Sequence, residues 1–393
     1  MRIPILSLIV FLTLMLGTDV YLYFAAKRAL KPRAAKIVIV AFLFVEYILL
    51  SIGLSLPARS GDSPVLLAKM WSLFAFMTIL IPKIVFCLID AIGFIPKLWK
   101  GKRWRGFGVC GMACAVIIGA VMWWGALVTR FDFTVKEIAV TDRHLPESFE
   151  GYRIVQFSDL HLGTYGGDTA YVAKVVDAIN ALEPDLIVFT GDLVNRNSEE
   201  LRPSTAVLGE LNAPDGVISI MGNHDYGDYY EWDNEGDKQQ SMADFYAMQR
   251  EMGWTLLLNS NKVIKHGTDS IIVIGVENVG DPPFTRYGNL KMSYPDVTDA
   301  NTKILLTHNP AHWEEEIKDS SANILLTLSG HTHAMQIRVG NFSPAAWRYR
   351  YWQGLYEDEK GHYINVDTGI GSVGFPMRVG VTPQVSLITL HKK

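Results

Sequence analysis

The sequence contains little cysteine, and what it has is confined to one end of the chain. Cys87, Cys110 and Cys114 are the three cysteines among 393 residues. The part of the chain beyond them therefore has no disulfide, no thiolate metal site and no cysteine nucleophile. The sequence also contains no internal repeat and no low-complexity segment.

Long apolar runs are absent after about residue 128, but four of them precede that point. They cover about residues 4–25, 36–56, 66–95 and 107–128, and a helix needs about 20 apolar residues to cross a bilayer. Arg2 before the first run is typical of a signal peptide, yet this run is long for one and three more spans follow. We therefore predict a transmembrane domain with four helices over residues 1–130 and a soluble domain over residues 131–393.

Positive charge is scarce in the second part of the chain. Residues 1–130 hold 15 Lys or Arg and 4 acidic residues, whereas the remainder holds 21 and 36. A globular part with such an acidic balance repels a polyphosphate backbone, so nucleic acid is not expected as a partner. The lipid bilayer is the partner that the apolar runs predict.

The basic residues of the short loops predict the orientation in the membrane, because Lys-rich and Arg-rich loops stay on the cytoplasmic side. Five basic residues follow the first span and five follow the third, whereas the region between the second and third spans offers only Arg59 and Lys69. This distribution places the domain after the fourth span outside the cell, in the periplasm or its equivalent.

Ionisable residues also lie inside the apolar runs, among them Asp19, Glu46, Lys83 and Asp90. Such groups are costly within a bilayer and usually face the interior of a helix bundle or a partner. They indicate either a polar track through the bundle or a simpler arrangement, in which Lys83 pairs with a carboxylate or the side chains reach toward the interface.

The second part of the chain reads as strands that run into polar turns. Short β-branched runs that end in Gly, Asn or Asp predict strands, and helical spacing of apolar residues predicts helices within residues 169–184 and 241–253. Strands alternating with helices favour a layered α/β domain. The predicted strands lie within residues 152–163, 184–194, 216–226, 270–278, 303–310, 323–333, 362–369 and 384–392.

Five of these strand ends carry side chains of one chemical kind, namely carboxylate, imidazole or amide. Divalent Mn, Fe and Zn accept this mixed oxygen and nitrogen set, and two metals about 3.5–4 Å apart are well served by a shared carboxylate. The residues are Asp159 and His161 in "SDLH", Asp192 in "TGDL", Asn223 and His224 in "GNHD", His308 in "THNP", and His331 and His333 in "GHTH".

The spacing within the motifs suggests how one strand end delivers two ligands. In an extended segment residues i and i+2 point to the same side, which predicts that Asp159 lies beside His161 and that His331 lies beside His333. Glycines at 191, 222 and 330 adjoin these residues, where the chain must turn sharply or let a phosphate approach.

With these five blocks in this order, residues 150–393 resemble the calcineurin-like metallophosphoesterase family. The resemblance implies a four-layer αββα sandwich with two divalent metal ions (Mn, Fe or Zn). It also implies ligands for one metal at Asp159, His161 and His333, ligands for the other at Asn223, His308 and His331, and Asp192 as the bridge.

The resemblance also implies a catalytic role for His224, held by Asp225, in stabilising the transferring phosphoryl group and protonating the leaving oxygen. The nucleophile would be metal-bound hydroxide. For Asp225 alone a helix N-cap is the alternative. "FSDLHLG", "LTHNP" and "GIGSVGFPMR" are similar to a bacterial membrane-associated subgroup that includes lipid hydrolases, which implies a multi-pass protein of the inner membrane. That subgroup often reads GHTHGGQ, whereas this sequence has Ala334 and Met335 in place of the two glycines, which crowds the mouth of the site.

Three further stretches are open to two interpretations. Residues 225–237 form either a solvated acidic loop or a wall of the pocket, and Asp281–Phe284 and Arg378 either contact substrate or do not. "WRYRYWQGLY", from Trp347 to Tyr356, is either an ordinary packed hairpin or a loop that rests at lipid headgroups, where Trp, Tyr and Arg are favoured.

Together these features predict a membrane-anchored dimetal phosphodiesterase or phosphatase acting on a phospholipid or lipid-linked phosphate. A second enzyme hypothesis is hydrolysis of a UDP-diacylglucosamine-type pyrophosphate, a cytoplasmic substrate that the loop charges disfavour. A third hypothesis is a membrane scaffold that binds metal without turnover.

Overall fold

The computed structural model describes residues 5–281, 285–294, 301–318 and 323–393. The chain divides into two compact units. One comprises Met1–Ala58 and Ala68–Ala126, and the other comprises Arg59–Leu67 and Leu127–Lys393. The first unit is helical and the second contains both sheets.

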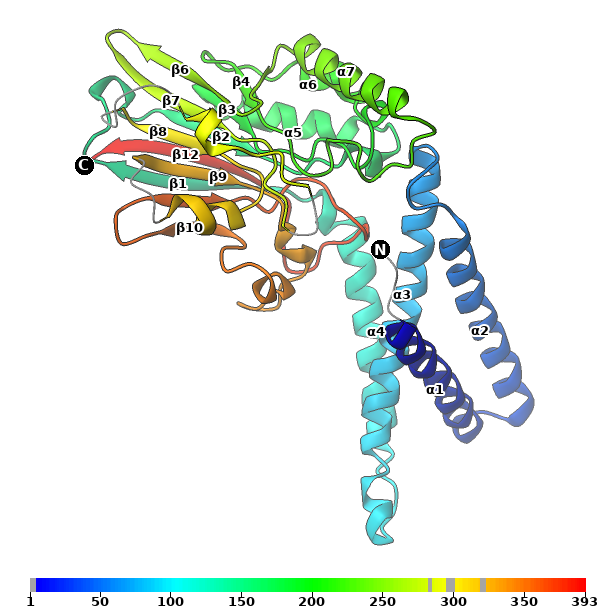
Figure 1. The fold of residues 1–393 in the computed structure, drawn as a ribbon. Coiled ribbons are helices and arrows are strands. Elements are labelled where there is room, and N and C mark those ends of the chain that lie inside the picture. Colours follow the sequence, from blue (N-terminus) through cyan, green and yellow to red (C-terminus); the bar gives the residue numbers. More distant parts are fainter. Residues whose placement is uncertain (1–4, 282–284, 295–300, 319–322) are drawn as a thin grey trace. The chain divides into compact units, whose positions relative to one another are not determined.

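Four long helices make up most of the helical unit (Figure 1). Each is long and apolar enough to cross a membrane, which confirms the predicted four-helix region, although Pro4 of the first predicted span lies outside the described residues. Helix α3 contains Pro82 and is followed by a short 3₁₀ turn, Ile95–Trp99. The four helices are α1 (Ile5–Ala29), α2 (Pro32–Ser55), α3 (Ser63–Ile92) and α4 (Gly106–Leu127).

The ionisable residues inside these helices are paired with one another. Lys83 Nζ lies 2.5 Å from Asp19 Oδ1 and 2.6 Å from Glu46 Oε1, and Tyr47 donates a hydrogen bond to Asp19. Asp90 accepts bonds from Tyr21, Arg28 and Arg103. The pairing interpretation of Lys83 is therefore confirmed, since its charge is met by two carboxylates.

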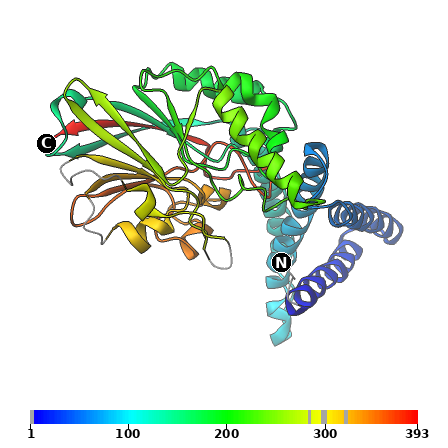
Figure 2. The same ribbon diagram turned by 45° about the horizontal axis from the view of Figure 1, so that its top comes forward.

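The second unit is built on two six-stranded mixed sheets (Figures 1 and 2). The first has the order β1-β12-β2-β3-β4-β5, in which β2 to β5 run parallel. Its strands are β1 (Thr134–Asp142), β2 (Arg153–Phe157), β3 (Leu186–Phe189), β4 (Val217–Ser219), β5 (Thr255–Leu256) and β12 (Gln384–Lys392).

The second sheet has the order β10-β11-β9-β8-β7-β6, and its strands β7, β8, β9 and β11 are parallel. Successive side chains along each strand point to opposite faces of the sheet. Its strands are β6 (Ser260–His266), β7 (Asp269–Gly275), β8 (Lys303–Leu306), β9 (Ile324–Ser329), β10 (Gly354–Glu357) and β11 (Tyr363–Val366).

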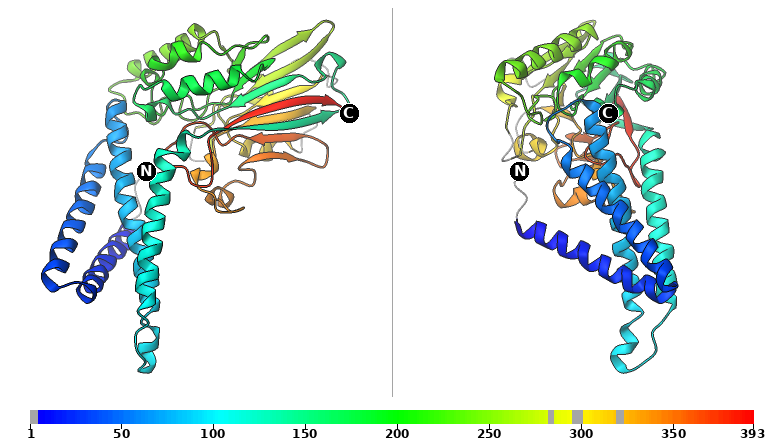
Figure 3. Two further views of the ribbon diagram at one scale, coloured as in Figure 1. Left: turned by 180° about the vertical axis from the view of Figure 1, so that it is seen from behind. Right: turned by 90° about the vertical axis from the view of Figure 1, so that its right-hand side faces the viewer.

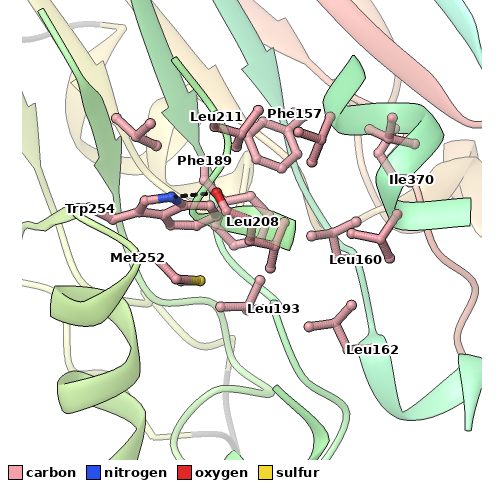
Figure 4. Close-up of a cluster of buried hydrophobic side chains, with 14 of the residues drawn as sticks. Phe157, Leu160, Leu162, Phe189, Leu193, Leu208, Leu211, Met252, Trp254 and Ile370 are labelled. Carbon is pink, nitrogen blue, oxygen red and sulfur yellow. Dashed lines mark hydrogen bonds between the residues drawn. The ribbon is translucent and has the colours of Figure 1, made fainter. Parts of the chain in front are cut away.

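Helices cover the outer face of the first sheet, drawn in green in Figure 1. They are α5 (Ala170–Asn180), α6 (Thr205–Leu208) and α7 (Glu235–Glu251). Phe157 and Phe189, paired in register on β2 and β3, pack with Trp254 in this layer, and Trp254 donates a hydrogen bond to the carbonyl of Leu208 (Figure 4).

A second apolar layer separates the sheets, and a third lies outside the second sheet. Between the sheets, Ile154 and Val188 pack with residues such as Leu306 and Leu328. Beyond the second sheet, α8 (Leu290–Ser293) and a single π-helical turn, Trp313–Ile317, supply the cover. Figure 3 shows the same layers from two further sides. This arrangement confirms the predicted αββα sandwich.

Several elements differ from the sequence-based prediction, which did not include strands β1, β5, β6 and β10 and began helix α7 later. Strand β1 precedes the first predicted strand and pairs with β12; it escaped notice because most of its residues face solvent. Helix α7 begins at Glu235, within the segment interpreted as a loop, because Asn234 caps it by accepting a bond from the backbone N–H of Asp237. Other short helical turns lie at Thr129–Phe131, Glu147–Phe149, Leu162–Tyr165, Ser198–Glu200, Arg202–Ser204 and Pro344–Trp347.

Candidate metal centre

The turn after β2 carries Asp159 and His161. Both residues adopt positive φ, 53° and 49°, so the segment is a left-handed turn and not the extended continuation that the i, i+2 argument assumed. Both side chains nevertheless converge: Asp159 Oδ1 lies 4.0 Å from His161 Nε2. The prediction that these residues lie together holds, but for a different conformational reason.

The turn after β9 delivers its two histidines to different places. His331 and His333 also have positive φ, 73° and 47°. His333 Nε2 lies 3.2 Å from Asp159 Oδ1, whereas His331 Nδ1 lies 3.2 Å from His308 Nε2. The two imidazoles of "GHTH" therefore belong to two neighbouring groups of side chains.

Asp192 lies between these two groups. Its Oδ2 is 3.6 Å from His161 Nε2 and 3.2 Å from His308 Nε2, and Asn223 Oδ1 is 3.1 Å from that same His308 nitrogen. Three sets of side chains could each hold a metal ion: Asp159 with His161 and His333; His161 with Asp192 and His224; and Asp192 with His308 and His331. The geometry thus brings all seven predicted ligands together, with Asp192 shared.

Two glycines let the backbone approach the aspartates. A Cβ at position 222 would meet the Asp192 carboxylate, and a Cβ at position 330 would meet the carboxylate of Asp159 and the hydroxyl of Ser158. Any larger residue there would displace a ligand. The glycines that the sequence placed beside the ligands thus permit close packing of turn on turn.

Burial and mutual contact set the protonation of these side chains in the direction that metal ligation requires. Burial opposes ionisation of Asp159, but the neighbouring His333 outweighs burial and lowers the pKa of the carboxyl group. Burial lowers the pKa of His161. A carboxylate and a neutral imidazole are the forms that bind metal.

His308 differs from its neighbours in protonation. Burial would lower its pKa, but the adjacent Asp192 carboxylate outweighs burial and raises it to about 9. Its Nδ1 contacts the carbonyl oxygen of Thr190 at 2.8 Å, which leaves Nε2 facing Asp192. A cation at this position therefore competes with a proton for His308 Nε2.

His224 stands at the edge of the centre, half-buried. Its backbone N–H donates to Asp192 Oδ1 at 2.8 Å, and its Nδ1 lies 2.7 Å from the carbonyl oxygen of Asn195. Tyr229 stacks on its ring, with 4.3 Å between ring centroids. Because Nδ1 is engaged by a carbonyl, Nε2 is the atom free to exchange a proton with a bound molecule.

Asp225 is placed differently from the expectation that it holds His224. Its buried carboxylate accepts bonds from the backbone N–H groups of Asp192, Leu193, Val194 and Gly222 at 2.8–3.1 Å. It therefore ties the turn after β3 to the turn after β4, and Asn195 takes the role of holding the imidazole. The helix N-cap alternative is also not what the structure has, since α7 is capped by Asn234.

Two tyrosines near the centre were noticed in the sequence only as members of longer segments, and their contacts with the centre were not predicted. Tyr229 donates nothing to a metal but stacks on His224 and accepts a bond from Asn223, which favours the pocket-wall interpretation of residues 225–237. Tyr349 Oη lies 2.9 Å from His331 Nε2. The contacts of Tyr229 are local, within the turn after β4, whereas the contact of Tyr349 with His331 spans 18 residues and has no local signal in the sequence.

Arg378 lies behind the centre, fully buried. Its guanidinium donates to the carbonyls of Thr368, Gly369 and Gly371 and lies 3.2 Å from His333 Nδ1. It therefore braces the loop behind His333 and does not face a substrate. Of the other segment suggested for substrate contact, residues 282–284 lie outside the described residues.

Comparison with known proteins assigns this site to a family. Residues 152–335 match the family model described as calcineurin-like phosphoesterase. The chain is 32% identical over 255 residues to the metallophosphoesterase YkuE of Bacillus subtilis (strain 168), a match that covers 63% of this chain and 81% of that protein. The chain belongs to the calcineurin-like phosphoesterase family. It is accordingly a metal-dependent phosphoester hydrolase.

Two other relatives have informative names: one combines a transmembrane protein with a metallophosphoesterase domain, and the other names a substrate. A transmembrane protein with a metallophosphoesterase domain from Danio rerio is 30% identical over 286 residues, covering 71% of this chain and 62% of that protein. The UDP-2,3-diacylglucosamine pyrophosphatase LpxG of Chlamydia trachomatis is 27% identical over 268 residues, covering 59% and 79%. With its four apolar helices, the present chain is a membrane protein.

The donor set fits the divalent metals that this phosphoesterase family uses. Asp159, His161 and His333 turn their ligand atoms toward one another, and the Nε2 atoms of the two histidines face each other at 3.0 Å. Oxygen and imidazole donors of this kind suit Mn, Fe and Zn. The residues present therefore fit a metal pair.

Ala334 and Met335 follow the last predicted ligand in a conformation that favours glycine. Their φ values are 49° and 46°, a region that costs most residues about 1 kcal/mol or more. Ala334 is buried, whereas Met335 is 45% exposed. Of the two side chains that replace glycine, that of Met335 is therefore at the surface and that of Ala334 is buried.

Proposed function

We propose that this membrane protein is an outward-facing dimetal phosphoesterase whose substrate is a lipid-borne phosphoester. The observation that carries the proposal is the grouping of seven ligand side chains around the shared carboxylate of Asp192. Asp159, His161, His333 and Asp192 would hold one divalent ion, and Asn223, His308, His331 and Asp192 would hold the other.

The chemistry follows from what each group can do. When bound, the two cations activate water for attack on phosphorus and neutralise charge on the phosphoryl oxygens. His224 stands beside this centre with Nδ1 engaged by Asn195, so its Nε2 donates a proton to the leaving oxygen. Asp225 supports this step indirectly, by fixing the turn that carries Asp192.

An exposed apolar surface beside the centre supports a lipid-borne substrate. We call it the apolar rim; its members are Met335, Ile337, Val339, Phe342, Trp347 and Phe375, all exposed. Trp347 is 80% exposed, and its ring packs against Phe342 with 5.4 Å between centroids. The backbone of Val339 is paired with that of Phe342. Exposed apolar groups gathered beside a catalytic centre are typical of surfaces that contact lipid.

The apolar rim differs from the stretch that the sequence suggested. Within "WRYRYWQGLY", Trp347 is exposed, but Trp352 is half-buried and its carbonyl accepts a bond from Thr332. Arg348 pairs with Asp281 and Arg350 with Glu314 at the surface. The interaction with lipid therefore centres on Trp347 and the preceding hairpin.

A second candidate substrate class is a nucleotide-linked acyl sugar pyrophosphate. The similarity to the chlamydial UDP-2,3-diacylglucosamine pyrophosphatase favours it. That similarity and the apolar rim agree on an acylated substrate and differ on the leaving group. The two candidates also require opposite sides of the membrane, because the nucleotide-linked compound is cytoplasmic.

The position of the loop between α2 and α3 supports the outward orientation. Residues Arg59–Leu67 belong to the same compact unit as the sandwich. This loop and the sandwich therefore lie on one side of the membrane, and this loop is the one poor in basic residues. We infer a multi-pass protein of a bacterial inner membrane with its catalytic domain in the periplasm.

The test uses full-length protein in vesicles, loaded with Mn, and a panel comprising phospholipids, lipid phosphates, a UDP-linked diacylated sugar and a soluble aryl phosphodiester. We expect the lipid-borne phosphoesters to be hydrolysed with the highest kcat/KM. Serine at both Phe342 and Trp347 should lower this value about 5- to 30-fold, the loss of partial burial of two large side chains, and should leave the soluble ester unaffected.

Val263→Ser is the matched control, since Val263 is an exposed apolar residue on β6, outside the apolar rim. A rate on the UDP-linked sugar exceeding that on all lipid phosphoesters would replace the first candidate with the second. Equal losses on vesicle-borne and soluble substrates would exclude a lipid-binding role for the apolar rim.

A further inference from the structure

The loop between α2 and α3 makes close contacts with the segment that follows the predicted bridging ligand. Arg196 lies four residues beyond Asp192 and is buried, with 3% of its surface exposed. Its Nη1 donates to the carbonyl of Ser60 at 3.2 Å, and its Nη2 donates to the carbonyl of Asp62 at 3.1 Å. A guanidinium offers a fixed fork of donors, so one side chain holds two carbonyl groups of the loop.

The inner side of the Arg196 guanidinium is held by Glu200. Arg196 Nε donates to Glu200 Oε1 at 3.2 Å, and the other oxygen of that buried carboxylate accepts from the backbone N–H of Asn195 at 2.6 Å. Asn195 is the residue whose carbonyl holds Nδ1 of His224 at 2.7 Å. An unbroken series of short polar contacts therefore runs from the loop to the imidazole.

The same loop also fixes the opposite wall of His224. Arg59 Nη2 donates to the carbonyl of Asp228 at 2.5 Å, and the carbonyl of Arg59 accepts from the backbone N–H of Glu231 at 2.6 Å. Tyr229, which lies between these two contacts in sequence, stacks on the His224 ring. The loop therefore forms hydrogen bonds with both segments that enclose the imidazole, one containing Arg196 and the other Asp228 and Glu231.

We propose that the loop between α2 and α3 acts through Arg196 as a positioning element for His224, so that the proton donor is oriented by residues of a loop that joins two of the apolar helices and belongs to the compact unit of the sandwich. Among the residues that the structure describes, Arg196 and Glu200 form hydrogen bonds to the loop and to Asn195, and to none of the predicted metal ligands. Their effect is to hold Asn195 and thereby the orientation of the imidazole. This inference rests on the proposed role of His224.

A difference in leaving groups provides the test. A proton donor matters for a poor leaving group and matters little for a good one. Turnover of methyl phenyl phosphate and methyl 4-nitrophenyl phosphate should therefore separate proton donation from every other function of the site. We would measure kcat on each of the two esters with full-length protein in vesicles, together with the metal content of each variant.

For Arg196→Met we expect kcat on the phenyl ester to fall about 10- to 100-fold, the range of a lost supporting contact. On the nitrophenyl ester we expect kcat within about 3-fold of the unaltered protein, because proton donation contributes little there. KM and metal content should not change. Arg196→Lys should recover part of the loss, since lysine reaches one carbonyl but lacks the fork.

Arg202→Met is the matched control, because Arg202 also pairs with a neighbouring glutamate, Glu199 at 2.7 Å, but on an exposed surface. It should behave like the unaltered protein on both esters. Equal losses of Arg196→Met on both esters, or a loss of metal, would assign Arg196 a general structural role and overturn the proposal.

The part played by the loop is tested separately at Gly61, which lies between the two carbonyls that Arg196 contacts and has a φ of +80°. Gly61→Val should reproduce the leaving-group signature, and the double variant should be no worse than the worse single variant, as expected of residues acting through one another. Normal turnover by Gly61→Val would remove the loop from the proposal.

His224→Ala separates failure of this inference from failure of the proposed function. If His224→Ala lowers kcat equally on both esters, His224 is not the proton donor and the proposed function is wrong in that respect. If His224→Ala shows the leaving-group signature and Arg196→Met does not, the proposed function stands and only the positioning role is excluded.

Discussion

Each of the two units buries a cluster of polar side chains, and the clusters differ in what balances their charge. In the helical unit, Lys83 on α3 contacts Asp19 on α1 and Glu46 on α2. A lysine thus meets carboxylates from two other helices. In the sandwich, the partners of Asp159 and Asp192 are imidazoles. Among the residues that the structure describes, neither aspartate forms an ion pair with Lys or Arg.

The difference indicates two kinds of buried polar cluster. Lys83 donates to carboxylates on two other helices and so joins three helices, with its polar partners supplied by the chain itself. The sandwich cluster turns nitrogen atoms toward one another, as His161 and His333 do at 3.0 Å. Such an arrangement is complete only with a cation between the donors. The first cluster therefore ties three helices together, and the donor set of the second fits a metal ion.

The largest expected effect comes from breaking the metal cluster at its shared member. Asp192→Ala removes the carboxylate that faces both halves of the centre, so we expect kcat/KM on a soluble phosphodiester to fall about 10⁴-fold. Metal content should fall with it. Asp177→Asn on the exposed face of α5 is the control, and it should retain full activity. A metal-binding scaffold has no turnover to lose, so absence of activity in the unaltered, metal-loaded protein would support that hypothesis.

The next effect comes from removing the cation of the helical cluster. Lys83→Met leaves two buried carboxylates without a partner, and breaking a buried ion pair in this way costs about 3–5 kcal/mol. We expect that loss in the free energy of unfolding, measured by denaturant titration in bicelles. The triple variant Asp19→Asn, Glu46→Gln, Lys83→Met should recover most of it.

Lys102→Met, an exposed lysine between α3 and α4, is the matched control for the helical cluster. It should leave the free energy of unfolding within about 0.5 kcal/mol of the unaltered protein. If Lys83→Met were equally mild, or if the triple variant were no better than Lys83→Met alone, the cluster would not serve as a tie between helices.

The sequence predicted the candidate site better than it predicted the path of the chain around it. Each ligand block is local: an apolar strand such as "NILLTLS" stops, and the polar residues that follow must lie at the sheet edge. What the local pattern did not show is the backbone conformation. Asp159, His161, His331 and His333 lie in left-handed turns, and nothing in an i, i+2 spacing distinguishes such a turn from an extended strand.

Contacts between residues far apart in the chain could not be predicted from the sequence, for a different reason. Arg196 meets carbonyls more than 130 residues away, and backbone acceptors carry no side-chain signature. Tyr349 was noticed only as part of an aromatic stretch, and its bond to His331 depends on the path of the intervening hairpin. Strand β1 escaped because an edge strand with charged, exposed residues lacks the apolar run of a central strand.

The smallest expected effect concerns a buried histidine, His312, which belongs neither to the Lys83 cluster nor to the metal centre. His312 is buried on the outer side of the second sheet, with Nδ1 2.9 Å from Thr307 Oγ1 and Nε2 3.4 Å from Glu316 Oε2. Burial, which the Glu316 carboxylate only partly offsets, lowers the pKa of His312 to about 4.

A lowered histidine pKa favours the neutral form in the folded protein, so His312 adds stability above its unfolded pKa of about 6.5 that is lost as the pH falls toward 4. We expect the unaltered protein to lose about 2 kcal/mol more than His312→Gln between pH 7 and 4.5, measured by denaturant titration in one metal buffer. His144→Gln, at an exposed histidine, is the control. Parallel pH profiles for the unaltered protein and His312→Gln would show that Glu316 fully compensates the buried imidazolium, and His312 would then belong with Lys83 among the groups whose charge the chain itself balances.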